Sequence, residues 1–195
     1  MTEHSANFLL EVIDIAKKLD AAKIEILADE LLEIRRNSGR LFIIGVGGSA
    51  ANSSHAVNDF RKLCGIDAIA PTDNIAEITA RTNDEGFETI FSEYLKVSKN
   101  SAKDGILILS VGGGSVEKNV SINLINAIKQ AKKNKTKVLG IVGKHDGFTA
   151  KNADVVITIP IENKNNLTPH SESFQGIIWH CLVSHPKLKI NPTKW

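Results

Sequence analysis

Two histidines and two carboxylates of this 195-residue chain have the types and spacing to hold a metal ion or to move protons. His55 and Asp59 lie four residues apart, which places both on one face of a helix. An isolated pair of this kind is more often a solvated surface feature. Glu172 precedes His180 by eight residues, or about 12 Å along a helix axis. One site can use Glu172 and His180 together only if both side chains reach inward or if another subunit completes the pocket.

His180 has a second interpretation. It lies within the apolar run Ile177-Ile178-Trp179-His180-Cys181-Leu182-Val183. A histidine in such surroundings is by default a packed core residue.

Two glycine-rich segments each follow a short apolar run. The first reads Gly45-Val46-Gly47-Gly48-Ser49, and the second reads Ser110-Val111-Gly112-Gly113-Gly114-Ser115. Glycines let the backbone approach a ligand closely, and the free N–H groups at the start of a following helix favour anions. Ligands of open parallel sheets lie at the carboxyl ends of the strands. The two loops therefore predict a cleft that holds a phosphate and the rest of a small polar molecule.

Other interpretations of the first glycine loop are a plain tight turn and a dinucleotide site. With Ala50 the loop fits the pattern G-x-G-x-x-A. A dinucleotide site also needs an acidic residue that ends a second strand about 20 residues later. Asp67 precedes the candidate strand and Asp73 follows Pro71, so neither fits clearly. Neither glycine loop continues into the lysine of a triphosphate-binding motif.

The elements that must position these residues alternate along the chain. Apolar residues recur every three or four positions from Asn7 to Arg36, which predicts two helices before the first strand. Apolar runs predict strands at 40–44, 105–110, 137–142 and 155–159, a less certain strand near 68–70, and helices at 120–133, roughly 145–151 and 172–184. The pattern predicts an α/β fold with an open, mostly parallel, doubly wound sheet, helices on both faces and an N-terminal helical extension.

Composition excludes several classes of protein. The length fits one domain, and the 42% of hydrophobic residues and the net charge of +2 exclude disorder and give no electrostatic reason to expect nucleic acid. The longest apolar runs are far shorter than the roughly 18 residues of a membrane span, and the N-terminal stretch mixes acidic with apolar residues, so we expect no signal peptide. Cys64 and Cys181 are too few for a disulfide-stapled secreted domain. We therefore expect a reduced, cytoplasmic protein that does not bind membranes.

The ordered motifs resemble those of the sugar isomerase (SIS) domain family. They are the first glycine loop, His55 with Asp59, Asn83-Asp84-Glu85-Gly86-Phe87, Ser110 to Ser115, Gly140-Ile141-Val142-Gly143, and Glu172 to His180. More narrowly, the chain resembles bacterial phosphoheptose isomerases, which interconvert sedoheptulose 7-phosphate and an aldoheptose 7-phosphate for surface-polysaccharide heptose. The resemblance implies a single SIS domain over 1–195, with helices at 1–37 that help build a homotetramer and a sugar-phosphate-binding core at 38–195.

The resemblance also implies roles for individual residues. The catalytic acid and base fall on Asp59 and His180. A divalent metal, expected to be zinc, falls to His55, Asp59, Glu172 and His180. The substrate-binding positions are Val46, Gly47, Gly48, Ser49, Asn83, Asp84, Ser110, Val111, Gly112, Ser115 and Glu172.

Several of these positions depart from the family pattern. Val46 replaces an asparagine, Val111 and Gly112 replace hydroxyl-bearing residues of the phosphate loop, Asp59 replaces a longer glutamate, and Glu172 replaces a glutamine. The altered phosphate loop favours a sugar-phosphate-binding or protein-interaction module that lost its chemistry. Retention of His55, Asp59 and His180 favours an isomerase, because a pure binder does not need three such groups. The third hypothesis, a dinucleotide-dependent oxidoreductase, depends on the first glycine loop alone.

Overall fold

The sheet has the parallel arrangement that the sequence predicts. The computed structural model describes residues 3–193. Its strands are β1 (Arg40–Ile44), β2 (Asp67–Ile69), β3 (Gly105–Ser110), β4 (Lys137–Val142) and β5 (Val155–Thr158). Every strand pair is parallel, and the strand order is β2-β1-β3-β4-β5. The order reverses between β1 and β3, so the crevice above their carboxyl ends is the switch point where such sheets bind ligands.

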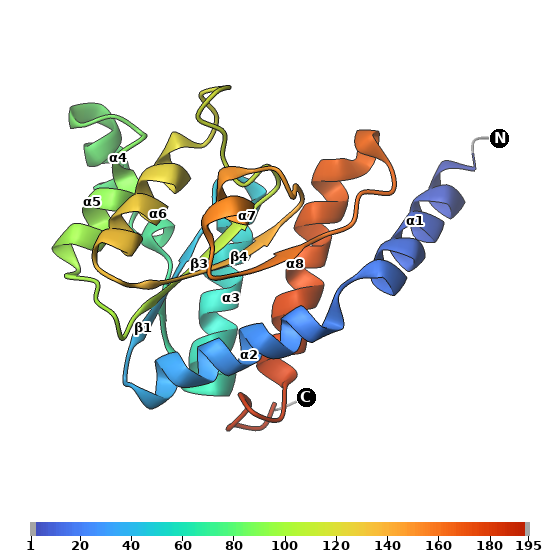
Figure 1. Cartoon of the computed structure of the whole chain (residues 1–195), viewed down its shortest axis with the longest axis horizontal. Helices are drawn as coiled ribbons and strands as arrows, with labels where there is room; N and C mark the ends of the chain where they lie inside the picture. Colours follow the sequence, from blue (N-terminus) through green and yellow to red (C-terminus); the bar gives the residue numbers. More distant parts are fainter. Residues whose placement is uncertain (1–2, 194–195) are drawn as a thin grey trace.

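Helices cover both faces of the sheet, which confirms the predicted fold class (Figure 1). One face carries α1 (His4–Lys18), α2 (Ala21–Arg36), α3 (Gly48–Cys64) and α8 (Leu167–Ser184). The other carries α5 (Ile90–Val97), α6 (Ile122–Lys133) and α7 (Phe148–Asn152), and α4 (Ile75–Asp84) packs beside α5. Short 3₁₀ turns occur at Pro71–Asp73 and Lys164–Asn166. Among the described residues, no helix combines the length and hydropathy needed to cross a bilayer.

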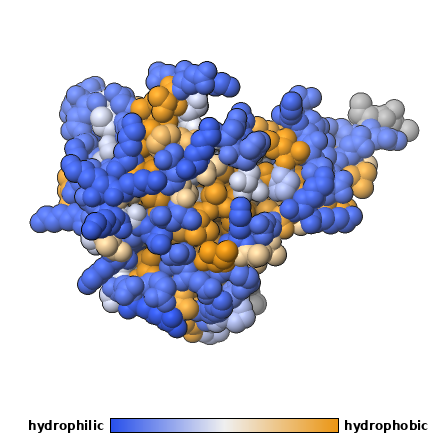
Figure 2. Space-filling view, in the orientation of Figure 1, coloured by the Kyte–Doolittle hydropathy of each residue, from blue (hydrophilic) through white to orange (hydrophobic). Residues whose placement is uncertain are grey.

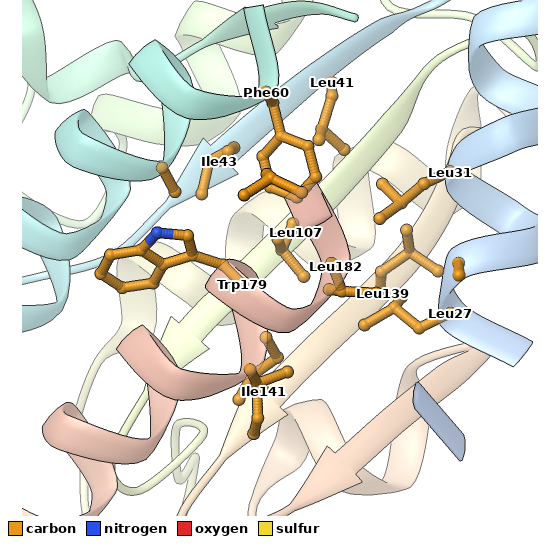
Figure 3. Packing of buried hydrophobic residues seen from close by; sticks show 14 of the residues in the cluster. Leu27, Leu31, Leu41, Ile43, Phe60, Leu107, Leu139, Ile141, Trp179 and Leu182 are labelled. Carbon is orange, nitrogen blue, oxygen red and sulfur yellow. The ribbon is translucent and has the colours of Figure 1, made fainter. Parts of the chain in front are cut away.

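The strands are buried on both sides because their side chains alternate between two hydrophobic clusters. In β1, Leu41 and Ile43 face α2, α3 and α8, whereas Phe42 and Ile44 face α5 and α6. Figure 3 shows the first cluster, in which Trp179 of α8 lies near the sheet. The remaining labelled members in that view are Leu27, Leu31, Phe60, Leu107, Leu139, Ile141 and Leu182. A continuous apolar run is what a strand covered on both faces requires.

Several element boundaries differ from the predicted ones. α6 begins at Ile122 rather than residue 120, because Ser115 and Val120 form an antiparallel bridge with N–H···O distances of 2.9 and 3.0 Å. α8 begins at Leu167, five residues earlier than predicted, and its first turn accepts Pro169 because N–H groups there need no helical partner. Neither α4 nor α5 was predicted. Both are short, and α4 contains no buried residue.

The N-terminal extension α1 projects from the body of the molecule (Figure 1). It is held through the fully buried Ile15 and through Glu11, whose carboxylate contacts Asn163 Nδ2, Asn166 Nδ2 and His170 Nε2, each at 2.7 Å. Hydrogen bonds from Asn166, His170 and Asn163 lower the pKa of Glu11 to about 2, so the anchor stays ionised at physiological pH. Exposed apolar side chains remain on α1: Leu9, Leu10 and Ile13. Figure 2 shows that apolar and polar surface alternate on the face of the molecule that it displays.

Candidate functional site

Helices α3 and α8 run side by side in the same direction from the carboxyl edge of the sheet. In their second turns, Asn52 Nδ2 donates to the backbone oxygen of Glu172 at 3.0 Å and, further along α8, to Gln175 Oε1 at 2.9 Å. Further along the same two helices, the ring of His55 lies 5.4 Å from that of His180. The pair of helices therefore brings together residues that are more than 100 positions apart in sequence.

The structure unites three of the four predicted metal ligands. One ligand atom from each of His55, Asp59 and His180 lies within 4.8 Å of the other two. Oδ2 of Asp59 is 3.4 Å from Nε2 of His55 and 3.4 Å from Nε2 of His180. Both imidazole side chains are 55% exposed, whereas the aspartate is 13% exposed. The exposure of His180 excludes the packed core histidine that its apolar neighbours suggested.

The spacing of these atoms fits a tetrahedral metal. Zinc ligands lie about 2.0–2.1 Å from the ion, so two ligands on one tetrahedron are roughly 3.3–3.4 Å apart. Oδ2 of Asp59 is separated from each of the two imidazole nitrogens by 3.4 Å. Three protein ligands with one remaining position are typical of catalytic rather than structural zinc sites. Two imidazoles and a carboxylate therefore suit a divalent cation in chemistry, and the two separations from Asp59 Oδ2 match the spacing of zinc ligands.

Glu172 lies away from this group, which corrects the prediction that it is a fourth metal ligand. Its carboxylate instead lies against Gly48, where an added Cβ would be 2.5 Å from Oε1. The reason is helical geometry, because eight residues of α8 separate Glu172 from His180 by two turns. The Glu172 carboxylate therefore lies beside the first glycine loop and not beside the metal ligands.

His55, Asp59 and His180, called here the metal-ligand group, line a cavity of about 300 Å³. Several other residues that line this cavity were not predicted from the sequence. Lys189 and Thr193 of the C-terminal segment line it together with Asn58 and Ser184. Hydrogen bonds from the backbone N–H of Ile190 and Asn191 to the oxygen of Leu63, at 2.9 and 3.1 Å, hold that segment against the end of α3. No motif pointed to these residues, because their approach depends on how the tail folds back.

The first glycine loop borders a cavity of about 500 Å³ at the switch point. Val46 lines it with Phe87 and Glu88 on one side, and on the other with residues of the loop before α6 and of the start of α6: Asn119, Ser121, Ile122 and Asn123. Ser49 does not take part, contrary to prediction. It is 2% exposed, and its Oγ accepts a hydrogen bond from Gln175 Nε2 at 3.1 Å, so the hydroxyl serves the contact between α3 and α8.

The predicted Asn83 and Asp84 lie exposed at the end of α4, where Asn83 Nδ2 donates to Asp84 Oδ1 at 2.7 Å. The structure does not place them among the residues that line the switch-point cavity. Phe87 and Glu88 occupy that wall instead, because the chain turns after α4 and brings the residues beyond Gly86 toward Val46.

The second glycine loop is held in a fixed shape. Gly113 has a φ of +69°, which favours glycine, and its N–H donates to Ser110 Oγ at 3.0 Å. Its carbonyl accepts two hydrogen bonds at 2.8 Å, from the backbone N–H and the hydroxyl of the buried Thr149. Phe148 N–H donates to the oxygen of Gly114 at 2.8 Å. Gly112 and Ser115 line a cavity of about 450 Å³, and Val111 is half-buried beside them.

The SIS domain family matches residues 6–143. A phosphoheptose isomerase of Geotalea daltonii is 31% identical over 186 residues, which cover 92% of this chain and 88% of the relative. The lincomycin biosynthesis protein LmbN of Streptomyces lincolnensis is 31% identical over 165 residues, 81% of this chain and 60% of that protein.

The fold agrees with a solved structure. The phosphoheptose isomerase of Neisseria gonorrhoeae superposes with a TM-score of 0.81 at 23% identity, over 93% of this chain and 97% of that one. The family expected from the motifs is thereby confirmed. The chain belongs to the SIS domain family and is an isomerase related to the phosphoheptose isomerases.

Proposed function

We propose that this phosphosugar isomerase acts on sedoheptulose 7-phosphate and forms an aldoheptose 7-phosphate for surface-polysaccharide heptose. The names of its relatives support the substrate class. The observation that carries the proposal is the convergence of His55, Asp59 and His180 on a helix pair that starts at a glycine loop. A binding module has no use for a solvent-open group of two imidazoles and a carboxylate.

The proposed reaction needs chemical groups that these side chains can supply. Aldose–ketose isomerisation moves a proton between neighbouring carbons through an enediol, so it needs an acid–base pair and stabilisation of oxyanion charge. Asp59 and His180 are our proposal for the acid–base pair. Both line the same cavity, where a sugar carbon and its oxygen can reach them.

We propose that His55, Asp59 and His180 also hold a divalent cation, with zinc as the best fit to their spacing. Such a cation polarises carbonyl and hydroxyl oxygens and lowers the cost of oxyanion charge.

The sugar phosphate also needs an anchor, and we assign this to Gly112 and Ser115 with the neighbouring Ser110 and Val111. The hydrogen bonds from Thr149 and Phe148 fix this loop before a ligand arrives. A fixed loop reduces the entropy that is lost when the phosphate binds. We assign Val46, Gly47, Gly48 and Glu172 to the sugar itself, at the switch point.

We propose that the active form is a homo-oligomer, most simply a tetramer. Within one chain the metal-ligand group and the glycine loops border separate cavities. His55 lies seven residues beyond Gly48 on α3, or about 10 Å along the axis. A second copy would close the site, and the apolar face of α1 offers a surface for assembly. The free thiols of Cys64 and Cys181 agree with our proposal of a cytoplasmic location.

A panel of ketose phosphates tests the function. We expect the purified protein to form an aldose from the seven-carbon ketose 7-phosphate faster than from five- and six-carbon analogues. The His180→Gln protein, prepared identically, measures any contaminating isomerase. A rate equal in both proteins, or no aldose from any phosphorylated ketose, would contradict the proposal.

A further inference from the structure

Three lysines converge on the cavity beside the second glycine loop. This cavity of about 450 Å³ lies between the loop after β3 and the loop after β4. Lys118 comes from the bridge-closed turn after Ser115, Lys144 from the segment after β4, and Lys151 from α7. Because they belong to three separate segments, their convergence is not a by-product of one charged helix face.

The cavity lining carries three ammonium groups and two carboxylates, those of Glu117 and Asp146, so its formal charge is +1. Among residues 3–193 none of the three ammonium groups forms an ion pair or a side-chain hydrogen bond. Other lysines of the same chain do find partners: Lys18 lies 2.7 Å from Glu162, and Lys187 lies 2.7 Å from Asp29. Three unpaired ammonium groups around one hollow form a site suited to an anion.

The glycine loop alone offers little to a phosphate. Val111 and Gly112 carry no hydroxyl, and Ser110 is 7% exposed with its Oγ already accepting from Gly113 N–H. Ser115 is the hydroxyl of this loop that lines the cavity. A phosphate monoester carries close to two negative charges at neutral pH, which lysine ammonium groups balance as point charges.

We infer that Lys118, Lys144 and Lys151, together with Ser115 and the loop glycines, bind the phosphate group of the substrate. The identity of that substrate rests on the proposed function, but the chemistry fits any phosphate monoester dianion. The positions are prepared in advance, because Phe148 N–H and the Thr149 hydroxyl tie the segment between Lys144 and Lys151 to the carbonyls of the glycine loop. The three charges replace the hydroxyl groups that the loop lacks.

Inorganic phosphate is the probe for a direct test by isothermal titration calorimetry at low ionic strength. We expect Lys144→Met, Lys118→Met and Lys151→Met each to raise the Kd for phosphate by about tenfold, the usual loss of one charged hydrogen bond. Lys129→Met is the matched control, because Lys129 is an exposed lysine of α6 outside this cavity. Its Kd should stay within about twofold of wild type. Circular dichroism checks that every variant is folded.

Two results would overturn the inference. One is a wild-type Kd in the Lys144→Met and Lys118→Met proteins, and the other is an equal loss in Lys129→Met, which would show only the overall charge of the surface. Kinetics separates this inference from the proposed function. If no ketose phosphate is isomerised while Lys144→Met still weakens phosphate binding, the function is wrong and the phosphate site stands. If isomerisation occurs with an unchanged KM in all three variants, the phosphate site is wrong and the function stands.

Discussion

The indole N–H of Trp179 donates a hydrogen bond to Oδ2 of Asp59 at 3.2 Å, the same oxygen that faces both histidines. Trp179 is 3% exposed, so its ring is fixed by the core while its one polar atom orients the carboxylate. A buried tryptophan thus links packing of the sheet to the position of a proposed metal ligand.

Trp179→Phe should weaken the cation site while preserving most of the packing. Loss of a group that orients a metal ligand typically lowers metal affinity by about 10–100-fold. Competition with a chromophoric chelator measures the zinc affinity, and a thermal melt reports folding. An unchanged zinc affinity in a folded Trp179→Phe protein would show that the indole does not support the site.

His180→Gln should leave the melting temperature nearly unchanged, because the histidine is half exposed. Turnover should fall by roughly 10²–10⁴-fold, the usual contribution of a positioned proton-transfer group. A chelator should inactivate the wild-type protein, and added zinc should restore it. An active but heat-labile His180→Gln protein that ignores chelators would return this residue to a packing role.

Asp104→Asn should destabilise the fold without changing the site. Asp104 lies at the opposite edge of the sheet, is 3% exposed, and joins β1 to β3 through Arg40 Nη2 at 2.9 Å and the Arg40 N–H at 2.8 Å. Loss of the charge leaves Arg40 without its partner, for an expected cost of about 2–4 kcal/mol in unfolding free energy. Urea titration measures this cost.

The same residue gives stability a defined pH dependence. Burial by itself would raise the pKa of Asp104, but hydrogen bonds from Arg40 and Ser101 outweigh it and hold the pKa below its usual value of 3.8. A carboxyl with a lowered pKa stabilises the folded state above its unfolded pKa and loses that contribution as the pH falls below about 4. The Asp104→Asn protein should lack this part of the loss of stability at low pH. If the unfolding free energies of the two proteins fell in parallel between pH 6 and pH 3, the assignment would be contradicted.

Leu9→Asp should impair assembly. Leu9 is 62% exposed on the apolar side of α1, so a charge there costs the isolated chain little and is costly in an interface. Light scattering should show a smaller particle at micromolar concentration. Asp14→Ala on the exposed part of α1 is the control, and equal masses for wild type and Leu9→Asp would exclude α1 from the interface.

The parallel sheet could be predicted from sequence because each long strand is a short apolar run that ends in turn residues, as Gly105–Ser110 does before its glycines. The pair His55 and Asp59 could be found because helical spacing is local. Their approach to His180 depends on the packing of α3 against α8, which no local pattern encodes; the family resemblance supplied it. For the same reason Ser49 and Glu172 were assigned to neighbours that the folded chain does not give them. The three cavity lysines were missed because each lies in a different segment.

The close approach of the Glu172 carboxylate to Gly48 makes the residue at position 48 depend on the side chain at position 172. A methyl group at position 48 would overlap a carboxylate of this length, so alanine becomes tolerable there only with a shorter or displaced side chain at 172. The atoms in the way are the far end of a flexible, half-buried side chain, so rotation of Glu172 relieves the overlap. A residue larger than glycine at position 48 would therefore turn the Glu172 carboxylate to another direction, and the size of residue 48 sets where that charge lies.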